Sequence, residues 1–338
     1  MISEDPQFYV QGVLNGDRRL LAKTITVIES SLLAHQQLAR AIIDLLLPYA
    51  GKAIRLGITG VPGVGKSTFI ESLGTMLVKK KRHRVAVLAV DPSSKRSGGS
   101  VLADKTRMEK LAVEERAFIR PSPSGGTLGG VARKTRETMI VCEAAGFDVI
   151  IVETVGVGQS ETTVASMVDF FLVLMIAGAG DELQGIKKGI LELADAVAVN
   201  KADGDNIERA EFARKQYETA LHFLAPSSPT WTPPVLTCSA LEMIDIDVIW
   251  DTVTEHHRKL TQTGELIANR KKQAVDWMWS LIKEGLNDRF YKNPGVIKIL
   301  PETIKEVENG TIASTIAANR LLDLLENRAS DKTHSTGT

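Results

Sequence analysis

The chain has 338 residues, of which 43% are hydrophobic and 24% are charged, so it is long enough for a large core with one or two smaller additions. Basic and acidic residues both number 41, and this zero net charge argues against a protein that binds nucleic acid through a broad basic surface. The two cysteines, Cys142 and Cys238, lie far apart without CxxC spacing, which suits a reducing compartment.

The sequence also argues against export and against a membrane protein. Its first residues, MISEDPQFYV, contain neither the basic nor the apolar region of a secretory signal. The longest apolar run, residues 170–177, is far too short to span a bilayer and is typical of a central strand. We therefore expect a soluble cytoplasmic protein that has neither a nucleic acid nor a membrane as a partner.

The first 50 residues predict an N-terminal helical extension, because segments 6–14, 18–30 and 33–49 carry apolar residues three and four positions apart. Residues 51–258 then alternate helical patterns with short apolar runs typical of strands. These runs are residues 54–59, 84–90, 117–120, 149–152, 170–176, 196–199 and 235–237. Continuous apolar strands between helices predict an α/β fold with a mostly parallel sheet that helices cover on both faces.

Segment 60–67, GVPGVGKS, fits the phosphate-loop pattern GxxxxGK[ST]. It follows an apolar run and precedes a helical pattern at 68–77, which is the strand-loop-helix setting that a P-loop NTPase needs. Glycines let successive backbone N–H groups turn toward phosphate oxygens. Lys66 would reach the β- and γ-phosphates, and the Ser67 hydroxyl would bind Mg²⁺. The candidate phosphate-binding residues are Gly60, Val61, Pro62, Gly63, Val64, Gly65, Lys66, Ser67 and Thr68.

The NKAD sequence at 200–203 predicts a guanine site. The Asp203 carboxylate can accept from both N1–H and the N2 amine of guanine, and adenine has no such donor pair. A buried hydrogen-bonding group rejects the ligand that leaves it unpaired. Lys201 would lie along the base, and Asn200 would tie this loop to the phosphate loop. A further base-side loop is expected at Ser239, Ala240 and Leu241. GTP and GDP are therefore the expected ligands.

Two predicted strands end in acids at the same sheet edge, Asp91 and Glu153, and Asp104 is a third candidate. Carboxylates held at strand ends suit Mg²⁺, although Asp91 could instead cap the turn before Pro92. Gly156 and Gly158 would let the following backbone rearrange when the γ-phosphate is lost, so we expect a switch there. Gln159 would orient the attacking water or would simply be solvated. The candidate catalytic residues are Lys66, Asp91, Asp104, Glu153 and Gln159.

Segment 177–189, AGAGDELQGIKKG, is either a further switch that contacts a partner or an ordinary loop after a strand. Its candidate residues are Asp181, Glu182, Gln184, Lys187 and Lys188. A second Gly-rich loop, 121–130, has Arg120 and Arg133 at its edges and is a candidate contact for a partner or the nucleotide. Without a well-placed arginine or water-orienting group, hydrolysis should be slow until a partner stimulates it.

The C-terminal part shows two long helical patterns, 256–290 and 301–325, whose apolar positions exceed what one domain edge would bury. We interpret residues 259–328 as a helical dimerisation arm; the alternative is that it packs on its own sheet. The last residues, 329–338, are polar and are expected to be disordered.

Taken together, GVPGVGKST, LAVDPSS, RPSPSGGTLGG, ETVGVGQSE, AGAGDELQGIKKGI and NKADGDN resemble the MeaB/ArgK family of P-loop GTPases, and the resemblance runs from residue 18 to about residue 293. It implies a homodimeric G-protein chaperone of adenosylcobalamin-dependent methylmalonyl-CoA mutase, which gates cofactor loading and protects the mutase from inactivation. By position it places Asp91, Asp104 and Glu153 around the metal and switches, and Lys187 and Lys188 in a loop that contacts the mutase. Nothing in composition or spacing points to cobalamin.

Three other classes compete with this interpretation. A nickel metallochaperone GTPase would need a Cys/His cluster, and His256 and His257 are the only neighbours among six histidines and two cysteines. A kinase or ATPase that acts on a transport protein would need an acceptor pocket and a base beside the γ-phosphate. A protein-targeting GTPase would carry a Met-rich segment, whereas the eight methionines are scattered singly.

Overall fold

The computed structural model describes residues 3–90, 108–121, 128–154, 159–178, 188–224 and 228–330. The chain divides into two compact units, Met1–Arg270 and Lys271–Thr338. The finer division predicted above, into 1–50, 51–258, 259–328 and 329–338, stays a prediction. None of the helices within the described ranges combines the length and the apolar character needed to cross a membrane.

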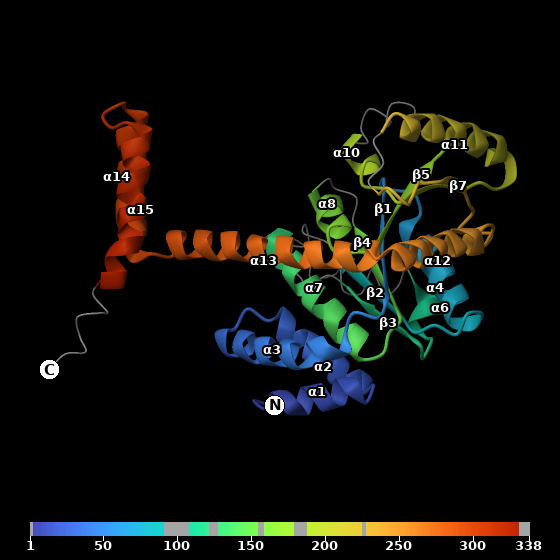
Figure 1. Ribbon diagram of the computed structural model, residues 1–338, viewed down its shortest axis with the longest axis horizontal. Helices are drawn as coiled ribbons and strands as arrows, with labels where there is room; N and C mark the ends of the chain where they lie inside the picture. The colour runs from blue at the N-terminus through green and yellow to red at the C-terminus, as the bar shows by residue number, and fades with distance from the viewer. Residues whose placement is uncertain are drawn as a thin grey trace. The chain divides into compact units, whose positions relative to one another are not determined.

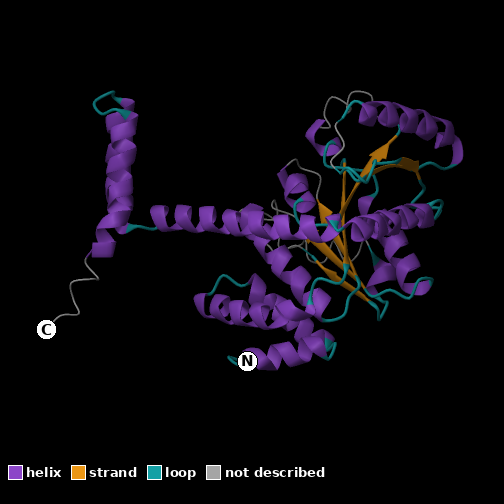
Figure 2. Ribbon diagram, in the orientation of Figure 1, coloured by secondary structure: helices purple, strands orange, loops and turns teal. Residues whose placement is uncertain are grey.

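The first unit is built on a seven-stranded sheet in the order β3-β2-β4-β1-β5-β6-β7, and every pair of neighbouring strands is parallel (Figures 1 and 2). The strands are β1 (Ile54–Gly60), β2 (Val85–Val90), β3 (Ala117–Arg120), β4 (Val149–Thr154), β5 (Phe170–Ile176), β6 (Ala196–Asn200) and β7 (Val235–Thr237). The predicted strands are confirmed, and their carboxyl ends meet at one edge of the sheet.

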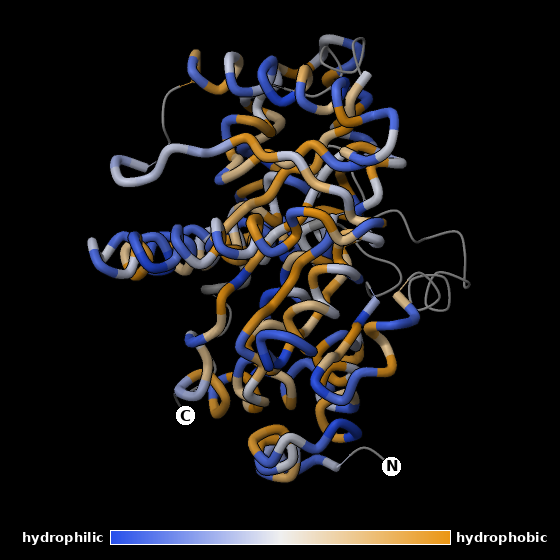
Figure 3. Tube along the Cα trace, turned by 90° about the vertical axis from the view of Figure 1, so that its right-hand side faces the viewer, coloured by the Kyte–Doolittle hydropathy of each residue, from blue (hydrophilic) through white to orange (hydrophobic). Residues whose placement is uncertain are grey.

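Alternate residues of each strand feed two separate cores. In β5, Phe170 and Leu172 join the core under α4 (Lys66–Lys79), α6 (Glu109–Ala112) and α12 (Ile246–Thr263), whereas Phe171 and Val173 join the core on the other face. There the cover consists of α7 (Leu128–Ala144), α8 (Gln159–Ala165), α10 (Lys188–Leu191) and α11 (Ile207–His222). The strands accordingly appear as apolar tracks through the molecule (Figure 3). The two-sided cover predicted from the continuous apolar runs is confirmed.

The N-terminal helical extension is also confirmed. It comprises α1 (Pro6–Leu14), α2 (Arg18–Glu29), α3 (Leu33–Leu46) and a short 3₁₀ turn, η1 (Leu47–Tyr49). The side chains of Asp5 and Asp17 cap the first two helices by accepting backbone N–H bonds. All three α-helices pack against α7, so they thicken the core on that face of the sheet (Figure 1).

The C-terminal part is helical, as predicted, but the predicted helix bounds are wrong. Residues 256–290 are divided by Gly264, which takes a left-handed conformation with φ +80° and separates α12 from α13 (Glu265–Tyr291). Pro301 lies inside α14 (Pro294–Glu308) instead of starting a helix, because Asn293 caps that helix and Pro294 occupies its first turn. A break at Gly310, with φ +68°, precedes α15 (Ser314–Ser330), and α14 packs against α15 within the second unit.

Candidate functional site

The phosphate loop, residues 60–67, connects β1 to α4 at the carboxyl edge of the sheet. Two of its glycines are required by geometry. Gly65 has φ +92°, and a Cβ there would lie 2.9 Å from the amide nitrogen of Asn200. Gly60 has φ +153°, and its Cβ would lie 2.4 Å from the carbonyl oxygen of Leu174. The phosphate loop therefore packs closely against β5 on one side and against the NKAD segment on the other, with no room for side chains at Gly60 and Gly65.

Lys66 lies at the first position of α4 and bends back over this loop. Its ammonium donates to the carbonyl oxygens of Gly60 at 2.7 Å and Val61 at 3.2 Å. Burial lowers the pKa of Lys66, and the carboxylates of Glu153 and Glu161 partly offset that effect. A cation held near backbone oxygens at the mouth of the loop is a ready partner for phosphate oxygens.

The NKAD segment and the 239–241 segment form one connected pair, which we call the base loops. Asn200 is 2% exposed; its amide donates to the Val64 carbonyl at 2.7 Å and accepts from the Ala240 N–H at 3.0 Å. This confirms the expected tie between the base loops and the phosphate loop. The Ser239 hydroxyl donates to the Asp203 carboxylate and accepts from the Glu242 N–H. These two hydrogen bonds fix the orientation of the Asp203 side chain, which is predicted to bind guanine.

Two other residues of the base loops were predicted on weaker grounds. Lys201 is exposed and has φ +62°, an uncommon backbone conformation for a non-glycine residue, and its carbonyl accepts from the Asn206 amide at 2.7 Å. Leu241 is 75% exposed. Strained backbone held by neighbouring bonds is frequent at ligand sites. Both side chains are therefore free of the core, as contacts with a ligand or a partner require.

The described part of the predicted Mg²⁺ site consists of Ser67 and Glu153, whose side chains lie together: the Ser67 hydroxyl donates to a Glu153 carboxylate oxygen at 3.2 Å. Hydroxyl and carboxylate oxygens suit this hard cation, which also keeps water and phosphate oxygens as ligands. No group of three or more His, Cys, Asp or Glu side chains placed to hold a metal occurs among the described residues. Ser67 and Glu153 therefore fit a Mg²⁺ site whose remaining ligands would be water and the phosphate oxygens of the nucleotide.

Several predicted site residues lie outside the described ranges. They are Asp91, Asp104, Gly156, Gly158, Asp181, Glu182, Gln184 and Lys187. Gln159 and Lys188 are the first residues of α8 and α10. Arg120 and Arg133, considered as nucleotide or partner contacts, are paired within the chain: Arg120 with Glu29 of α2, and Arg133 with Glu137 at 3.0 Å.

Sequence reasoning missed three buried polar residues next to this site. Glu161 on α8 is 2% exposed and interacts electrostatically with Lys66. Thr59 and Thr154, at the ends of β1 and β4, are 1% and 0% exposed and bond to each other. A strand-end threonine carries no signal of its own in a single sequence, because its partner depends on the register between two distant strands.

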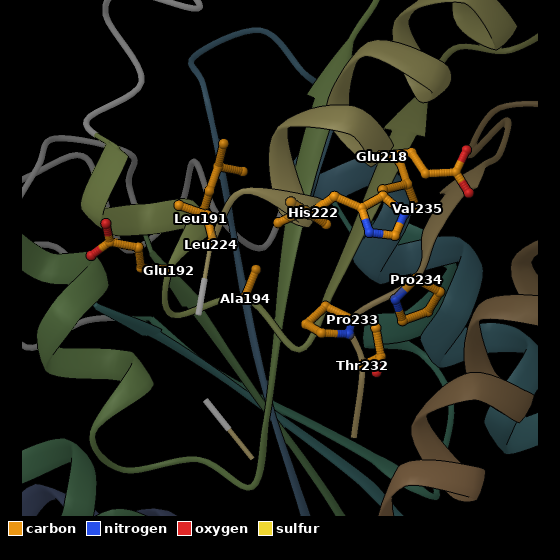
Figure 4. A pocket seen from close by; sticks show the side chains of 11 residues that line it. Leu191, Glu192, Ala194, Glu218, His222, Leu224, Thr232, Pro233, Pro234 and Val235 are labelled. Carbon is orange, nitrogen blue, oxygen red and sulfur yellow. The ribbon is translucent and has the colours of Figure 1, made fainter. Parts of the chain in front are cut away.

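None of the residues of these loops lines a separate cavity of about 500 Å³, whose lining side chains are drawn in Figure 4. Ala194, two residues before β6, and Val235, the first residue of β7, contribute to its wall, so it opens near the amino ends of these strands. Leucines and prolines form most of the remaining lining, and the polar lining residues include Glu192 and Glu218. Carboxylates repel phosphates, so this cavity does not compete with the phosphate loop as the nucleotide site.

Comparisons with known proteins agree with the family that the motifs resemble. The family model described as "Methylmalonyl Co-A mutase-associated GTPase MeaB" matches residues 21–295. A Caulobacter vibrioides protein whose name contains the word GTPase is 56% identical over 307 residues, which cover 91% of this chain and 94% of that protein. A mouse protein named "Methylmalonic aciduria type A homolog, mitochondrial" is 44% identical over 327 residues, which cover 94% of this chain and 79% of that protein.

Among solved structures, a crystal structure described as that of an LAO/AO transport system kinase is similar over almost the whole chain. Its TM-score is 0.78 and its sequence identity 41%, and the match covers 96% of this chain and 99% of that one. The parallel sheet and the helical additions at both ends are therefore shared with a protein of known structure.

Proposed function

Since this chain belongs to the MeaB family of GTPases, we propose that it hydrolyses GTP to GDP and phosphate as a chaperone of adenosylcobalamin-dependent methylmalonyl-CoA mutase, gating cofactor loading and protecting the mutase from inactivation. The observation that carries the nucleotide part is the pair of hydrogen bonds of the Asn200 side chain, one to Val64 and one to Ala240, which joins the phosphate loop to the base loops. The mutase part rests on the family description and on the name of the mouse relative.

In this proposal each described residue has one task. The phosphate-loop N–H groups bind the phosphates, and Lys66 moves its ammonium from the Gly60 and Val61 carbonyls to phosphate oxygens. Asp203, oriented by Ser239, accepts from guanine. Ser67 and Glu153 would hold Mg²⁺, which neutralises charge on the phosphates when it is bound. Positioning and charge supply most of the catalysis in phosphoryl transfer. We therefore expect a slow intrinsic rate of GTP hydrolysis until a partner adds or places an arginine or a water-orienting group.

Replacing Asp203 with Asn tests the base assignment. The new amide can donate to the C2 carbonyl of xanthine, but it keeps a single acceptor oxygen and cannot accept from both the N1–H and the N2 amine of guanine. We expect weaker GTP binding by about 10²-fold or more, with xanthosine triphosphate binding retained, in calorimetric titrations. An unchanged preference for GTP would refute the role of Asp203.

Adding the mutase tests the chaperone assignment. The GTPase rate should rise when an adenosylcobalamin-dependent methylmalonyl-CoA mutase is present, because partner-supplied groups accelerate related enzymes by up to about 10³- to 10⁵-fold. The two proteins should also elute together. If neither occurs while GTP is still hydrolysed, the chaperone proposal fails and the GTPase proposal remains.

The second unit supports the homodimer as part of the same proposal. Apolar side chains stay exposed along α13, among them Met278 (47%), Trp279 (54%) and Leu286 (55%), and such surface is typical of an interface. Light scattering should give twice the mass of the chain. The cytoplasmic location stays a proposal from the two buried free cysteines.

Neither the kinase nor the metallochaperone alternative is favoured by the comparisons or by the described residues. The kinase description belongs to the similar crystal structure, whereas the matching family model is described as a GTPase. A metallochaperone would need a cluster of metal ligands, and the described residues contain none of three or more His, Cys, Asp or Glu.

A further inference from the structure

Strands β1 and β4 are neighbours in the sheet, and both lead into the candidate site. Their parallel pairing is described from Ile54 and Val149 to Ile58 and Glu153. The next residue of β1, Thr59, lies opposite Val173 of β5, and the next residue of β4, Thr154, lies opposite Val90 of β2. The carboxyl ends of the strands are the usual ligand site of such sheets.

One side-chain bond continues the connection past this point. The hydroxyl oxygens of Thr59 and Thr154 lie 2.7 Å apart, and the residues are 1% and 0% exposed. A buried hydroxyl costs free energy unless it is bonded, so the two threonines stabilise each other's position. The pair therefore joins β1 to β4 one residue beyond the last pair described between these strands, Ile58 and Glu153.

Each threonine is the chain neighbour of a candidate site residue. Thr59 precedes Gly60, whose carbonyl accepts from Lys66, and Thr154 follows Glu153, which accepts from Ser67. The Ser67–Glu153 bond uses the same oxygens that would face Mg²⁺, so it is available only until the ion binds. The threonine bond uses neither oxygen and can persist in the loaded site.

We propose that Thr59 and Thr154 form a positioning clasp that holds Glu153 at a fixed distance from the phosphate loop, and so sets how strongly Mg²⁺ retains the nucleotide. This inference rests on the proposed GTPase function and adds two positioning residues to it. Mg²⁺ requires ligands at nearly ideal short distances. A small increase in the distance between Glu153 and the phosphate loop should therefore weaken Mg²⁺ binding strongly.

The test separates the hydroxyl from the methyl group at each position. Thr59→Val and Thr154→Val keep the shape and delete the bond, whereas Thr59→Ser and Thr154→Ser keep the bond and delete a methyl group. The readout is the release rate of a fluorescent GDP analogue from the full-length protein as Mg²⁺ is varied. Thr24→Val is the matched control, because Thr24 is also buried and bonds locally, to the Leu20 carbonyl in α2 at 2.7 Å.

We expect the valine variants to need about fivefold more Mg²⁺ for half-maximal retention of GDP, which is what one net hydrogen bond is worth. The serine variants and Thr24→Val should stay within about twofold of the natural chain, and GDP binding in excess EDTA should not change. The combined Thr59→Val/Thr154→Val variant leaves neither buried hydroxyl unpaired, so it provides the same measurement if a single valine variant unfolds.

Two results would overturn the clasp. In one, serine variants lose Mg²⁺-dependent retention while valine variants keep it, which would assign the effect to packing. In the other, all variants match the natural chain. If the natural chain itself retains no GDP at any Mg²⁺ concentration, the proposed GTPase function fails and the clasp fails with it.

Discussion

His256 gives a sharp prediction about pH because it is a neutral histidine inside the first unit. It is 1% exposed, and its ring packs edge-on against Phe170 and Trp231, with centroids 5.0 and 4.9 Å away. Its Nε2 lies 3.7 Å from the Asp195 carboxylate, and Nδ1 has no hydrogen-bond partner among the described residues. Burial is the main cause that lowers the pKa of His256, to about 4.

The sign of the effect follows from proton uptake. Unfolded, His256 has its ordinary pKa of 6.5, so between pH 6.5 and 4 the unfolded chain binds a proton that the folded chain does not. The free energy of unfolding therefore falls as the pH falls through this window. The difference of 6.5 − 4 = 2.5 pKa units, at about 1.36 kcal/mol each, makes the full loss about 3 kcal/mol below pH 4. At pH 5 the loss is about 2 kcal/mol.

His256→Phe keeps an aromatic ring in the cluster and removes the titration. In urea unfolding at pH 7.5, the free energies of unfolding of His256→Phe and of the natural chain should agree within about 1 kcal/mol. At pH 5 the free energy of unfolding of the variant should have risen by about 2 kcal/mol relative to that of the natural chain. Burial raises the pKa of Asp195 to about 7, and its carboxylate lies 3.7 Å from the replaced ring, so the comparison is repeated with Asp195→Asn in both proteins, which removes that titration. His222→Phe, at an exposed position, is the control. Parallel stability curves for the natural chain and His256→Phe between pH 7.5 and 5 would refute the reasoning.

Three further substitutions test the site and the frame around it. Lys66→Ala should weaken GTP binding by about 10- to 100-fold in calorimetry, since a charge-assisted bond to phosphate is lost; unchanged affinity would remove the phosphate-loop assignment. Asn200→Ala breaks both loop contacts and should lower GDP affinity about tenfold or more, measured by fluorescence titration; an unchanged affinity would mean that the loops hold without it. Arg270→Met leaves the carboxylate of Asp169, 2% exposed, without its guanidinium and should cost about 3–5 kcal/mol in urea unfolding, part of which Arg270→Met/Asp169→Asn restores.

The sheet could be predicted almost completely because each strand has a local cause. Val, Ile, Leu and Ala runs buried on both faces admit one interpretation, and Asn200 closes β6 at the point where the apolar run ends. The helices after residue 255 were harder. Apolar spacing continues across Gly264, and only its left-handed backbone shows that the helix ends there. Pro301 was taken for a helix start, although Asn293 and Pro294 supply the better cap seven residues earlier.

The candidate site divides in the same way. Lys66, Asn200 and Asp203 belong to contiguous motifs whose spacing already specifies their chemistry. Thr154 and Glu161 lie inside the segment ETVGVGQSE and Thr59 directly precedes the phosphate loop, but these motifs do not specify what the three side chains contact. Their burial and neighbours depend on how α8 packs and on the register of β1 against β4, which are properties of the folded chain.

The two edges of the sheet use polar groups in opposite ways. At the carboxyl edge, Lys66 bonds to backbone carbonyls and Ser67 reaches Glu153 at 3.2 Å, contacts that a phosphate and a cation can replace at small cost. At the amino edge, Arg270 donates four bonds of 2.5–2.7 Å to Asp169 and to the carbonyls of Gly51 and Ala53, just before β5 and β1. These bonds are charge-assisted, the Asp169 carboxylate that accepts two of them is buried, and no ligand is needed to complete them. Substitutions at the amino edge should therefore change the stability of the chain far more than its nucleotide affinity, and substitutions at the carboxyl edge should do the reverse.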